Sequence, residues 1–316
     1  MSVKKVPMRD GYGEALLELC RQKEDILVLD ADVSKSTRTV WVHDKYPEYF
    51  LNMGISEQDM VGTAAGLALS GVTPFVSTYC VFLCGRAWDQ IRTTVCYNDL
   101  NVKFGGAHAG ISVGPDGATH QALEDLALMR VLPHMTVIAP CDAVETKKAT
   151  LAVAKYPGPC FLRFGREPVP VITDEDSVFE IGRANILREG GDAAVFAIGT
   201  EVYEALEAAE QLSSEGVEIS VINMHTLKPL DGACIERMVR SCGAIVTAEE
   251  HQEIGGLGGA VAEYLALHCP APMETVAVRD SFGESGDPDE LMAKYGLNAS
   301  AIIDAVHRVI ARKAKV

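Results

Sequence analysis

Short apolar runs alternate with stretches of helical spacing along the first half of the chain. The runs are bounded by polar or glycine-containing segments and indicate buried strands at 25–33, 71–78, 101–111, 135–140 and 159–164. Between them, apolar residues recur three or four positions apart, which predicts helices at 56–70, 86–97, 121–132 and 142–156. Strands that alternate with helices favour a mostly parallel sheet covered on both faces.

This rhythm breaks at 166–182, where prolines and an acidic cluster replace it, and then starts again. The second half predicts strands at 192–200, 217–227, 243–250 and 273–280. Its predicted helices cover 201–212, 234–241, 258–269 and 299–313. We therefore predict an α/β protein of two domains, each a mostly parallel sheet flanked by helices, at residues 1–170 and 189–316 with a linker at 171–188.

Composition narrows the class of protein. The net charge of −16 argues against nonspecific nucleic-acid binding, which depends on lysine and arginine. No apolar stretch approaches the ~20 residues that span a bilayer, and the N-terminal segment lacks the apolar core of a signal peptide. The nine cysteines form no CxxC pair, which indicates reduced, mostly buried thiols in a cytoplasmic protein.

The segment LNMGISEQDMVGTAAGLALSG (51–71) predicts a helix with mostly small residues on one face. Ser56 is a candidate N-cap, and Asp59 three residues later completes an approximate capping box. The glycines and alanines that follow would let a backbone or a flat ligand approach closely. Glu57 falls in the first turn, where it either complements the helix dipole or serves chemistry.

A glycine-rich loop, HAGISVGPDGATHQ (108–121), follows the third predicted strand. It carries His108, Asp116 and His120 at a carboxyl end of the predicted sheet, where α/β proteins bind ligands. Histidine transfers protons near neutral pH, although these side chains could equally cap the next helix. The spacing of the two histidines matches no compact zinc site.

A second glycine-rich segment, QEIGGLGGAVAE (252–263), lies between a predicted strand and a predicted helix. It superficially suggests dinucleotide binding, but G-x-G-x-x-G does not fit in register. We predict tight strand-to-helix packing there, which could also serve assembly.

Taken in order, these segments resemble the pyrimidine-binding and C-terminal domains of transketolase. The resemblance rests on GISEQDMVGTAAGLA, STYCVFLCGRAWDQIR and PDGATHQALEDLALMRVLPHMTVIAPCDAVE, and it continues through NMHTLKPLD and AIVTAEEHQEIGGLGGAVAE. It implies an enzyme that uses thiamine diphosphate to transfer a two-carbon ketol unit from a ketose phosphate to an aldose phosphate.

The resemblance also implies roles in cofactor binding. Glu57 matches the glutamate that hydrogen-bonds the aminopyrimidine nitrogen and favours its imino tautomer. Phe82 and Tyr79 match residues that stack on or line that ring, although they could be ordinary core residues, and Gly85 stands where the family often has a further aromatic. Asp32 aligns with an acidic residue near the thiazolium, but it could equally be a turn residue.

Three positions match residues that bind the sugar phosphate: Ser36, His108 and Arg166. The planar fork of Arg166 suits phosphate oxygens. Arg163 could share that role or could be a structural ion-pair partner. Lys35 stands where the family more often has proline, which alters the loop around Ser36.

Two further positions match residues that contact the sugar hydroxyls around the bond being cleaved, Asp116 and His120. In that role, His120 assists proton movement as the C2–C3 bond breaks or forms. Together with Glu57, these residues form the expected catalytic set.

An absent motif predicts a partner. Thiamine enzymes hold the diphosphate through Mg²⁺ (or Ca²⁺) with a GDG motif and later asparagines, and this chain has no GDG. The resemblance implies that a separate N-terminal transketolase subunit holds the metal and that this chain holds none. A 2+2 heterotetramer is then the simplest assembly.

Three alternatives stay open from the sequence. The chain could be similar to a 1-deoxy-xylulose-5-phosphate synthase, to the β subunit of a 2-oxoacid dehydrogenase, or to a non-catalytic regulatory or scaffold subunit. The DGATHQ segment fits sugar enzymes better than oxoacid enzymes, and the retained polar residues argue against a scaffold.

Overall fold

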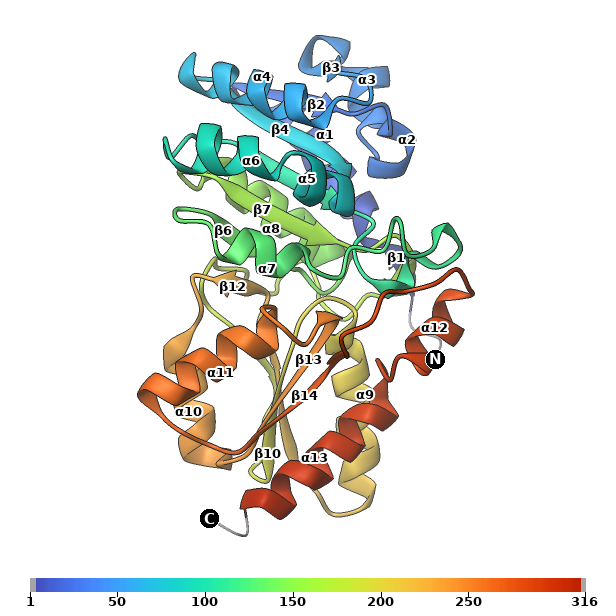
Figure 1. Cartoon of the computed structure of the whole chain (residues 1–316), viewed down its shortest axis with the longest axis vertical. Helices are drawn as coiled ribbons and strands as arrows, with labels where there is room; N and C mark the ends of the chain where they lie inside the picture. Colours follow the sequence, from blue (N-terminus) through green and yellow to red (C-terminus); the bar gives the residue numbers. More distant parts are fainter. Residues whose placement is uncertain (1–3, 314–316) are drawn as a thin grey trace.

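The computed structural model describes residues 4–313, in which the first half of the chain forms a seven-stranded sheet (Figure 1). Its strands, in spatial order, are β12 (Thr226–Lys228), β6 (Thr136–Ile138), β7 (Cys160–Phe164), β5 (Lys103–Ala107), β4 (Thr73–Tyr79), β2 (Ile26–Asp30) and β3 (Phe50–Asn52). All neighbours are parallel except β12, which comes from the second half of the chain and pairs antiparallel with β6.

The second half forms a five-stranded sheet. Its order is β14 (Met273–Val278), β13 (Ile245–Gln252), β10 (Ala193–Ala197), β11 (Ile219–Asn223) and β9 (Asn185–Arg188). Only β9 is antiparallel to its neighbour among these described strands. Two mostly parallel sheets therefore confirm the predicted fold class.

Helices cover both faces of each sheet. In the first half they are α1 (Met8–Arg21), α2 (Ser34–Thr37), α3 (Val40–Lys45), η1 (Pro47–Tyr49), α4 (Glu57–Leu69), α5 (Cys80–Arg86), α6 (Trp88–Gln90), η2 (Ile91–Cys96), η3 (Ile111–Asp116), α7 (Asp125–Arg130) and α8 (Ala143–Lys155). In the second half they are α9 (Glu201–Ser214), α10 (Gly232–Cys242), α11 (Leu257–His268), α12 (Pro288–Lys294) and α13 (Ala299–Lys313).

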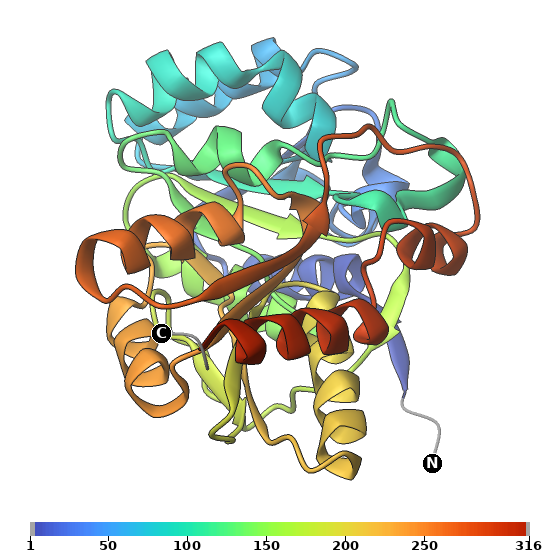
Figure 2. The same cartoon turned by 60° about the horizontal axis from the view of Figure 1, so that its bottom comes forward.

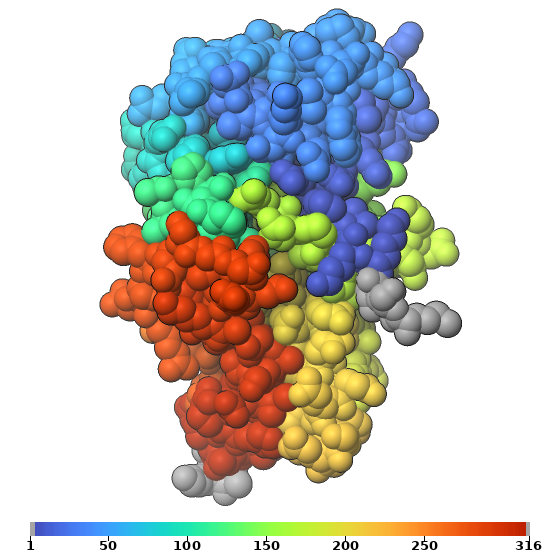
Figure 3. Space-filling model, turned by 90° about the vertical axis from the view of Figure 1, so that its right-hand side faces the viewer, coloured from blue at the N-terminus to red at the C-terminus, as the bar shows by residue number. Residues whose placement is uncertain are grey.

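Three apolar clusters hold these layers together. Helices α1 and α8 pack on one face of the first sheet, and α9 and α13 lie side by side on one face of the second (Figure 2). The largest cluster joins α4, α5 and α7 of the first half to α10 and α11 of the second. The two halves thus share a core and lie directly against each other in the space-filling view (Figure 3).

Regular structure lies directly before the predicted linker, 171–188, and at its end. β8 (Pro168–Pro170) pairs antiparallel with β1 (Lys5–Pro7), and β9 lies within the stretch 171–188. The prolines suit β8 because a two-stranded ribbon leaves ladder positions that need no N–H. The exact domain boundaries stay a prediction.

Two predicted helices differ in detail. The stretch 86–97 forms a short α-helix followed by the six-residue π-helix η2, and α7 begins at Asp125 rather than at 121. Residues before Asp125 instead belong to the glycine-rich loop, where Ala109 and Ala122 form an isolated bridge.

Two other observations bear on the class of protein. No helix within residues 4–313 is long and apolar enough to cross a membrane. All nine cysteines are free and eight of them are buried, as the sequence predicted.

Candidate functional site

Five neighbouring parallel strands bring the predicted site residues to one edge of the first sheet. Each strand is followed, at its carboxyl end, by a segment that carries at least one of them: Arg166 after β7, His108 after β5, Tyr79 and Phe82 at the end of β4, Asp32 and Ser36 after β2, and Glu57 after β3. Ligands of open α/β sheets bind at this edge. The topology therefore gathers residues that are up to 134 positions apart, from Asp32 to Arg166.

Glu57 lies buried at the start of α4, 4% exposed. Its Oε1 accepts a hydrogen bond of 2.9 Å from Nη1 of Arg86, at the end of α5. The start of α4 and Arg86 line a hollow of ≈ 440 Å³. A buried carboxylate thus faces an open space beside the sheet edge.

The predicted capping box at this helix is wrong. Ser56 is the N-cap residue, but its hydroxyl donates to the carbonyl of Met53 at 2.7 Å, and no side chain caps the helix there. The small residues of this helix do not share one environment. Ala64 and Ala65 pack in the core, while Gly62 and Gly66 are exposed. Close approach is possible only along the glycine side.

Aromatic rings connect Glu57 to the glycine-rich loop. Tyr79 stacks on Phe82 with ring centroids 5.7 Å apart, and His120 lies edge-on to Phe82 at 5.1 Å. The guanidinium of Arg86 lies 4.0 Å from the centroid of Phe82. Arg86 therefore makes two contacts at once, one with the carboxylate of Glu57 and one with an aromatic face. At Gly85, an added Cβ would meet nothing within 4 Å, so the space next to this residue is open.

His108 lies next to Tyr79 in a strained and buried position. Its φ is +58°, the ring centroids are 4.3 Å apart, and its Nδ1 is buried without a hydrogen-bond partner. Burial, together with the charges of Arg9 and Arg166, lowers the pKa of His108 to about 3. The imidazole is therefore neutral and keeps an unused polar atom in the site.

Three arginines approach His108 from different elements. Arg166 donates to the carbonyl of Val113 at 3.0 Å and contacts Asp116 at 3.2 Å. Arg9, in the first turn of α1, donates to the carbonyl of Ser36 at 3.2 Å. Burial and the neighbouring Arg38 lower the pKa of Arg9, as expected where positive charges gather.

The sequence pattern did not indicate two members of this group, Arg9 and Arg38. Arg38 lies two positions after Ser36 in the same loop, which is a signal that could have found it. Its Nε contacts Asp10 at 2.6 Å, and that carboxylate offsets part of the positive charge. Arg9 carries no local motif, because only the fold brings α1 to this edge.

Ser36 and Asp32 occupy the same loop but differ in their contacts. The Ser36 hydroxyl and the Tyr79 hydroxyl lie 2.9 Å apart, which ties Ser36 to the aromatic group. Asp32 is exposed, has a φ of +64°, and accepts from the amide of Asn52 at 3.0 Å. In the described part of the chain, no hydrogen bond or ion pair joins Asp32 to the other predicted residues, so its proposed role depends on position alone.

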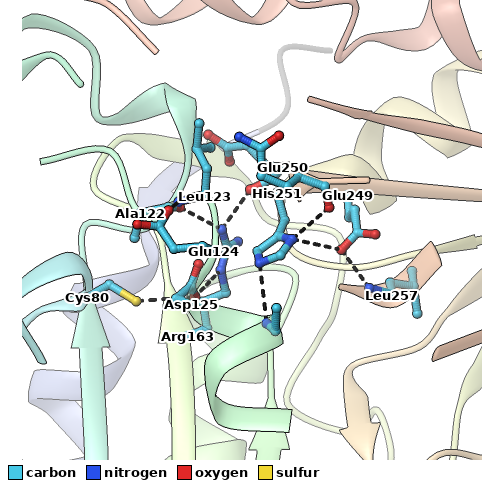
Figure 4. Close-up of polar contacts among 12 residues, drawn as sticks. Cys80, Ala122, Leu123, Glu124, Asp125, Arg163, Glu249, Glu250, His251 and Leu257 are labelled. Carbon is cyan, nitrogen blue, oxygen red and sulfur yellow. Dashed lines mark hydrogen bonds and ion pairs between the residues drawn. The ribbon is translucent and has the colours of Figure 1, made fainter. Parts of the chain in front are cut away.

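The contacts of Arg163 favour the structural ion-pair role over phosphate binding. Its Nε contacts the buried carboxylate of Asp125 at 2.8 Å, and its Nη2 donates to the backbone carbonyl of Glu250 at 2.7 Å (Figure 4). Burial by itself lowers the pKa of Arg163, but the charges of Asp125, Cys80 and Glu250 and the hydrogen bond to Asp125 together outweigh burial, so the pKa lies above the ordinary value. Its donors face this ion pair and not the group around His108.

The glycine-rich segment after β13 packs as predicted. The carboxylate of Glu249 accepts from the amides of Leu257 and Gly258, each at 2.7 Å, at the start of α11. A Cβ at Gly256 would lie 2.1 Å from that carboxylate. An acidic side chain of the same chain thus fills the helix N-terminus that a dinucleotide phosphate would need.

Residues 4–313 contain no group of three or more His, Cys, Asp or Glu side chains arranged to hold a metal ion. The chemistry available at the edge is a buried carboxylate, an aromatic face, two imidazoles and a cluster of guanidinium groups.

Comparisons with known proteins show which family the chain belongs to. The profile of the family described as "Transketolase, pyrimidine binding domain" matches residues 4–171, and "Transketolase, C-terminal domain" matches residues 182–302. The chain is 45% identical over 298 residues to a "Putative transketolase C-terminal section" of Methanocaldococcus jannaschii, covering 93% of each chain. It is 40% identical to a "6-deoxy-6-sulfo-D-fructose transketolase subunit SqwH" of Clostridium sp., covering 97% of this chain and 95% of the relative.

A solved structure described as "Split gene transketolase, inactive beta4 tetramer" superposes with a TM-score of 0.92 at 47% identity. The match covers 98% of this chain and 99% of that one. With two family profiles, full-length relatives and a matching structure in agreement, the chain belongs to the transketolase family and carries its pyrimidine-binding and C-terminal domains.

Proposed function

We propose that this chain is the C-terminal subunit of a thiamine-diphosphate-dependent transketolase that works in the cytoplasm with a separate N-terminal subunit. The reaction transfers a two-carbon ketol unit from a ketose phosphate to an aldose phosphate. The observation that carries the proposal is the position of Tyr79, which contacts Phe82, His108, His120 and Ser36. Tyr79 thus joins the residues predicted to bind the cofactor to those predicted to bind the sugar substrate.

The residues beside the hollow at α4 fit the aminopyrimidine ring. Glu57 offers a buried carboxylate for a ring nitrogen, and Phe82 offers an aromatic face. Arg86 now makes both of these contacts, so the ring has to share them with that guanidinium or replace it. When bound, thiamine diphosphate would supply a nucleophilic carbon for the ketose carbonyl and an electron sink for the pair released when the C2–C3 bond breaks.

The other end of the group fits a sugar phosphate. Arg9, which donates to the backbone carbonyl of Ser36, and Arg166, which contacts Asp116, provide guanidinium donors, and Asp116 accepts from sugar hydroxyls. His108 adds a hydrogen-bonding nitrogen without a further positive charge, because its pKa lies far below neutral pH. His120 lies edge-on to both Tyr79 and Phe82, where it can move a proton as the C2–C3 bond changes.

The partner subunit would hold the diphosphate and Mg²⁺ (or Ca²⁺) in a 2+2 heterotetramer. The name of the Clostridium relative supports a divided enzyme, since it is called a transketolase subunit. The similar solved structure consists of one kind of chain and is described as inactive.

The donor anion is a phosphate or a sulfonate. Guanidinium groups bind either tetrahedral anion, and one relative is named for a sulfonated fructose. A donor panel of xylulose 5-phosphate, fructose 6-phosphate, 6-deoxy-6-sulfofructose and pyruvate separates these cases. Pyruvate as the best donor would favour the synthase or oxoacid alternatives.

The central test replaces Glu57 in the assembled enzyme. The chain is co-purified with the GDG-containing N-terminal chain from the same genome and assayed with thiamine diphosphate, Mg²⁺ and the donor panel. Glu57→Ala is expected to lower kcat by roughly 10²- to 10⁴-fold, the usual range for a lost acid–base group, without changing the mass of the assembly.

The matched control is Asp59→Ala, which removes another acid from the first turn of the same helix but an exposed one. If Glu57 only complemented the helix dipole, the two variants would behave alike. Equal turnover in both variants would therefore remove Glu57 from the mechanism.

A further inference from the structure

The loop 108–121 carries three predicted site residues on an irregular backbone. His108, Gly110, Gly114 and Gly117 all have positive φ values, between +58° and +89°. Only the short 3-10 helix η3 lies within it. Because no long helix or strand fixes this conformation, contacts with other parts of the chain have to do so.

One such contact comes from the second half of the molecule. Glu250 lies on β13 and is 3% exposed. Its Oε1 accepts the backbone N–H of Ser112 in the loop, and its Oε2 accepts from the hydroxyl of Thr200 at 3.2 Å. A single buried carboxylate thus joins the loop of one sheet to the core of the other.

The loop is shaped to admit this carboxylate. At Gly110, whose φ is +89°, an added Cβ would lie 2.3 Å from the carboxyl carbon of Glu250. Any larger residue there would collide with Glu250 and would also strain the backbone. The absence of a side chain at Gly110 lets the carboxylate reach the amide of Ser112.

Charges nearby make a buried glutamate tolerable. Arg163 binds the backbone carbonyl of Glu250 and is itself paired with Asp125, at the start of the helix that follows the loop (Figure 4). Burial raises the pKa of the Glu250 carboxyl, whereas Arg163 and the Ser112 amide oppose that effect. A carboxylate that accepts a backbone N–H forms a stronger hydrogen bond than a neutral acceptor does.

A second contact from the same half holds the far end of the loop. The side-chain amide of Gln121 donates to the carbonyl of Ile111 at 3.0 Å and to the carbonyl of Glu284 at 2.9 Å. The loop is therefore gripped between β13 and the segment before α12, both of which belong to the C-terminal half.

We propose that Glu250 is a positioning residue, by which the C-terminal domain sets the geometry of His108, Asp116 and His120 toward the sugar substrate. The inference rests on the proposed function, because it gives the second domain a part in that reaction. The side chain of Glu250 makes no hydrogen bond to the predicted cofactor-binding residues or to Arg9, Arg38 and Arg166. It acts through the backbone of the loop.

The test combines hydrogen exchange of the full chain with kinetics of the assembled enzyme. In Glu250→Ala, amide exchange in peptides covering 109–122 is expected to speed up at least about tenfold, which equals a loss of ~1.4 kcal/mol of protection. The donor kcat/KM is expected to fall by roughly 10- to 100-fold, because a shift near 1 Å can cost that much, while the Kd for thiamine diphosphate stays unchanged. Glu250→Gln keeps an acceptor for Ser112 and is expected to restore most of both signals.

The matched control is Glu249→Ala, the adjacent buried glutamate on the same strand, which caps α11 and does not contact the loop. Its exchange should rise at 257–260 and not at 109–122. If Glu250→Ala does not fold, Glu250→Asp makes the same test, because its carboxylate falls one methylene short of the amide.

Loop exchange that is equal in the two alanine variants, or an unchanged donor kcat/KM in Glu250→Ala, would overturn the proposal. A wild-type assembly without ketol transfer would contradict the proposed function instead. The exchange measurement still decides whether Glu250 holds the loop in that case, so the two failures are distinguishable.

Discussion

His108 shows how single residues adapt to the crowded edge of the first sheet. It takes a backbone conformation that most side chains avoid, lies buried, and has Arg9, Arg38 and Arg166 around it. A protonated imidazole in that place would lose its hydration and meet three like charges. The residue is therefore kept neutral, which leaves the positive charge for an anionic ligand.

This neutral state predicts a specific pH dependence of stability. Folding lowers the pKa of His108 from 6.5 to about 3, so in this range the unfolded chain takes up the proton more readily than the native protein does. The stability it contributes is present above pH 6.5 and is lost as the pH falls toward 3. Between pH 6.5 and 4, the free energy of unfolding of the wild-type protein therefore depends on pH. His108→Asn is expected to reduce that dependence by up to ~1.4 kcal/mol per pH unit, as measured by urea denaturation.

The control for this prediction is His134→Asn. His134 also has a positive φ, +65°, but its side chain is 53% exposed. Asparagine tolerates this backbone conformation at both positions. The control should retain the wild-type slope, and an identical slope in all three proteins would contradict the role assigned to burial of His108.

At the scale of elements, Asp142 joins a helix start to the segment between the sheets. Its Oδ1 accepts from the amide of Glu145 and caps α8 at 2.8 Å. Its Oδ2 accepts from the amides of Ile172 and Thr173 at 2.8 and 2.7 Å. One buried carboxylate thus fixes the course of the chain as it leaves the first sheet.

Asp142→Ala is expected to lower the free energy of unfolding by about 2–4 kcal/mol, because it removes a cap and leaves buried amides without acceptors. Asp287→Ala, at the exposed cap of α12, should cost about 1 kcal/mol or less. Urea midpoints of the two variants measure the difference. Similar shifts would show that the contacts with Ile172 and Thr173 contribute little.

At the scale of the whole molecule, the two halves are interlocked rather than merely adjacent. The second half contributes β12 to the edge of the first sheet, and one apolar cluster runs through both halves. The buried pair of Arg163 and Asp125 adds the backbone of Glu250 from the second sheet to this interface. This arrangement lets the C-terminal half bear directly on the loop at the site.

Arg163→Met is expected to destabilise the chain by about 3–5 kcal/mol, because it leaves Asp125 buried without a counter-charge. Arg130→Met removes an ion pair that does cross between the halves, but its partner Glu263 is 63% exposed, so a loss of about 1 kcal/mol or less is expected. Chemical denaturation of both variants tests this. A loss no larger in Arg163→Met than in Arg130→Met would show that the buried contacts of Arg163 contribute no more to stability than an exposed ion pair does.

The candidate site could be predicted from sequence only where its residues lie in distinctive segments. Glu57, His108, Asp116 and His120 stand in motifs with unusual glycine and polar content, so the pattern singled them out. Arg9 lies in an ordinary amphipathic helix, and its proximity to Ser36 depends on the packing of α1 against the sheet. No local signal marks such a residue.

The alternation of apolar runs and helical spacing by itself determined two parallel α/β layers, because burial on both faces of a sheet imposes that pattern on every strand. It also determined that polar residues follow the strands and so meet at one edge. Only the tertiary structure decided that Arg163 pairs with Asp125, that β12 joins the other half's sheet, and that Glu250 reaches Ser112. These contacts join residues 38 to 138 positions apart, and their partners are chosen by distance and burial in the packed molecule, which no stretch of sequence encodes alone.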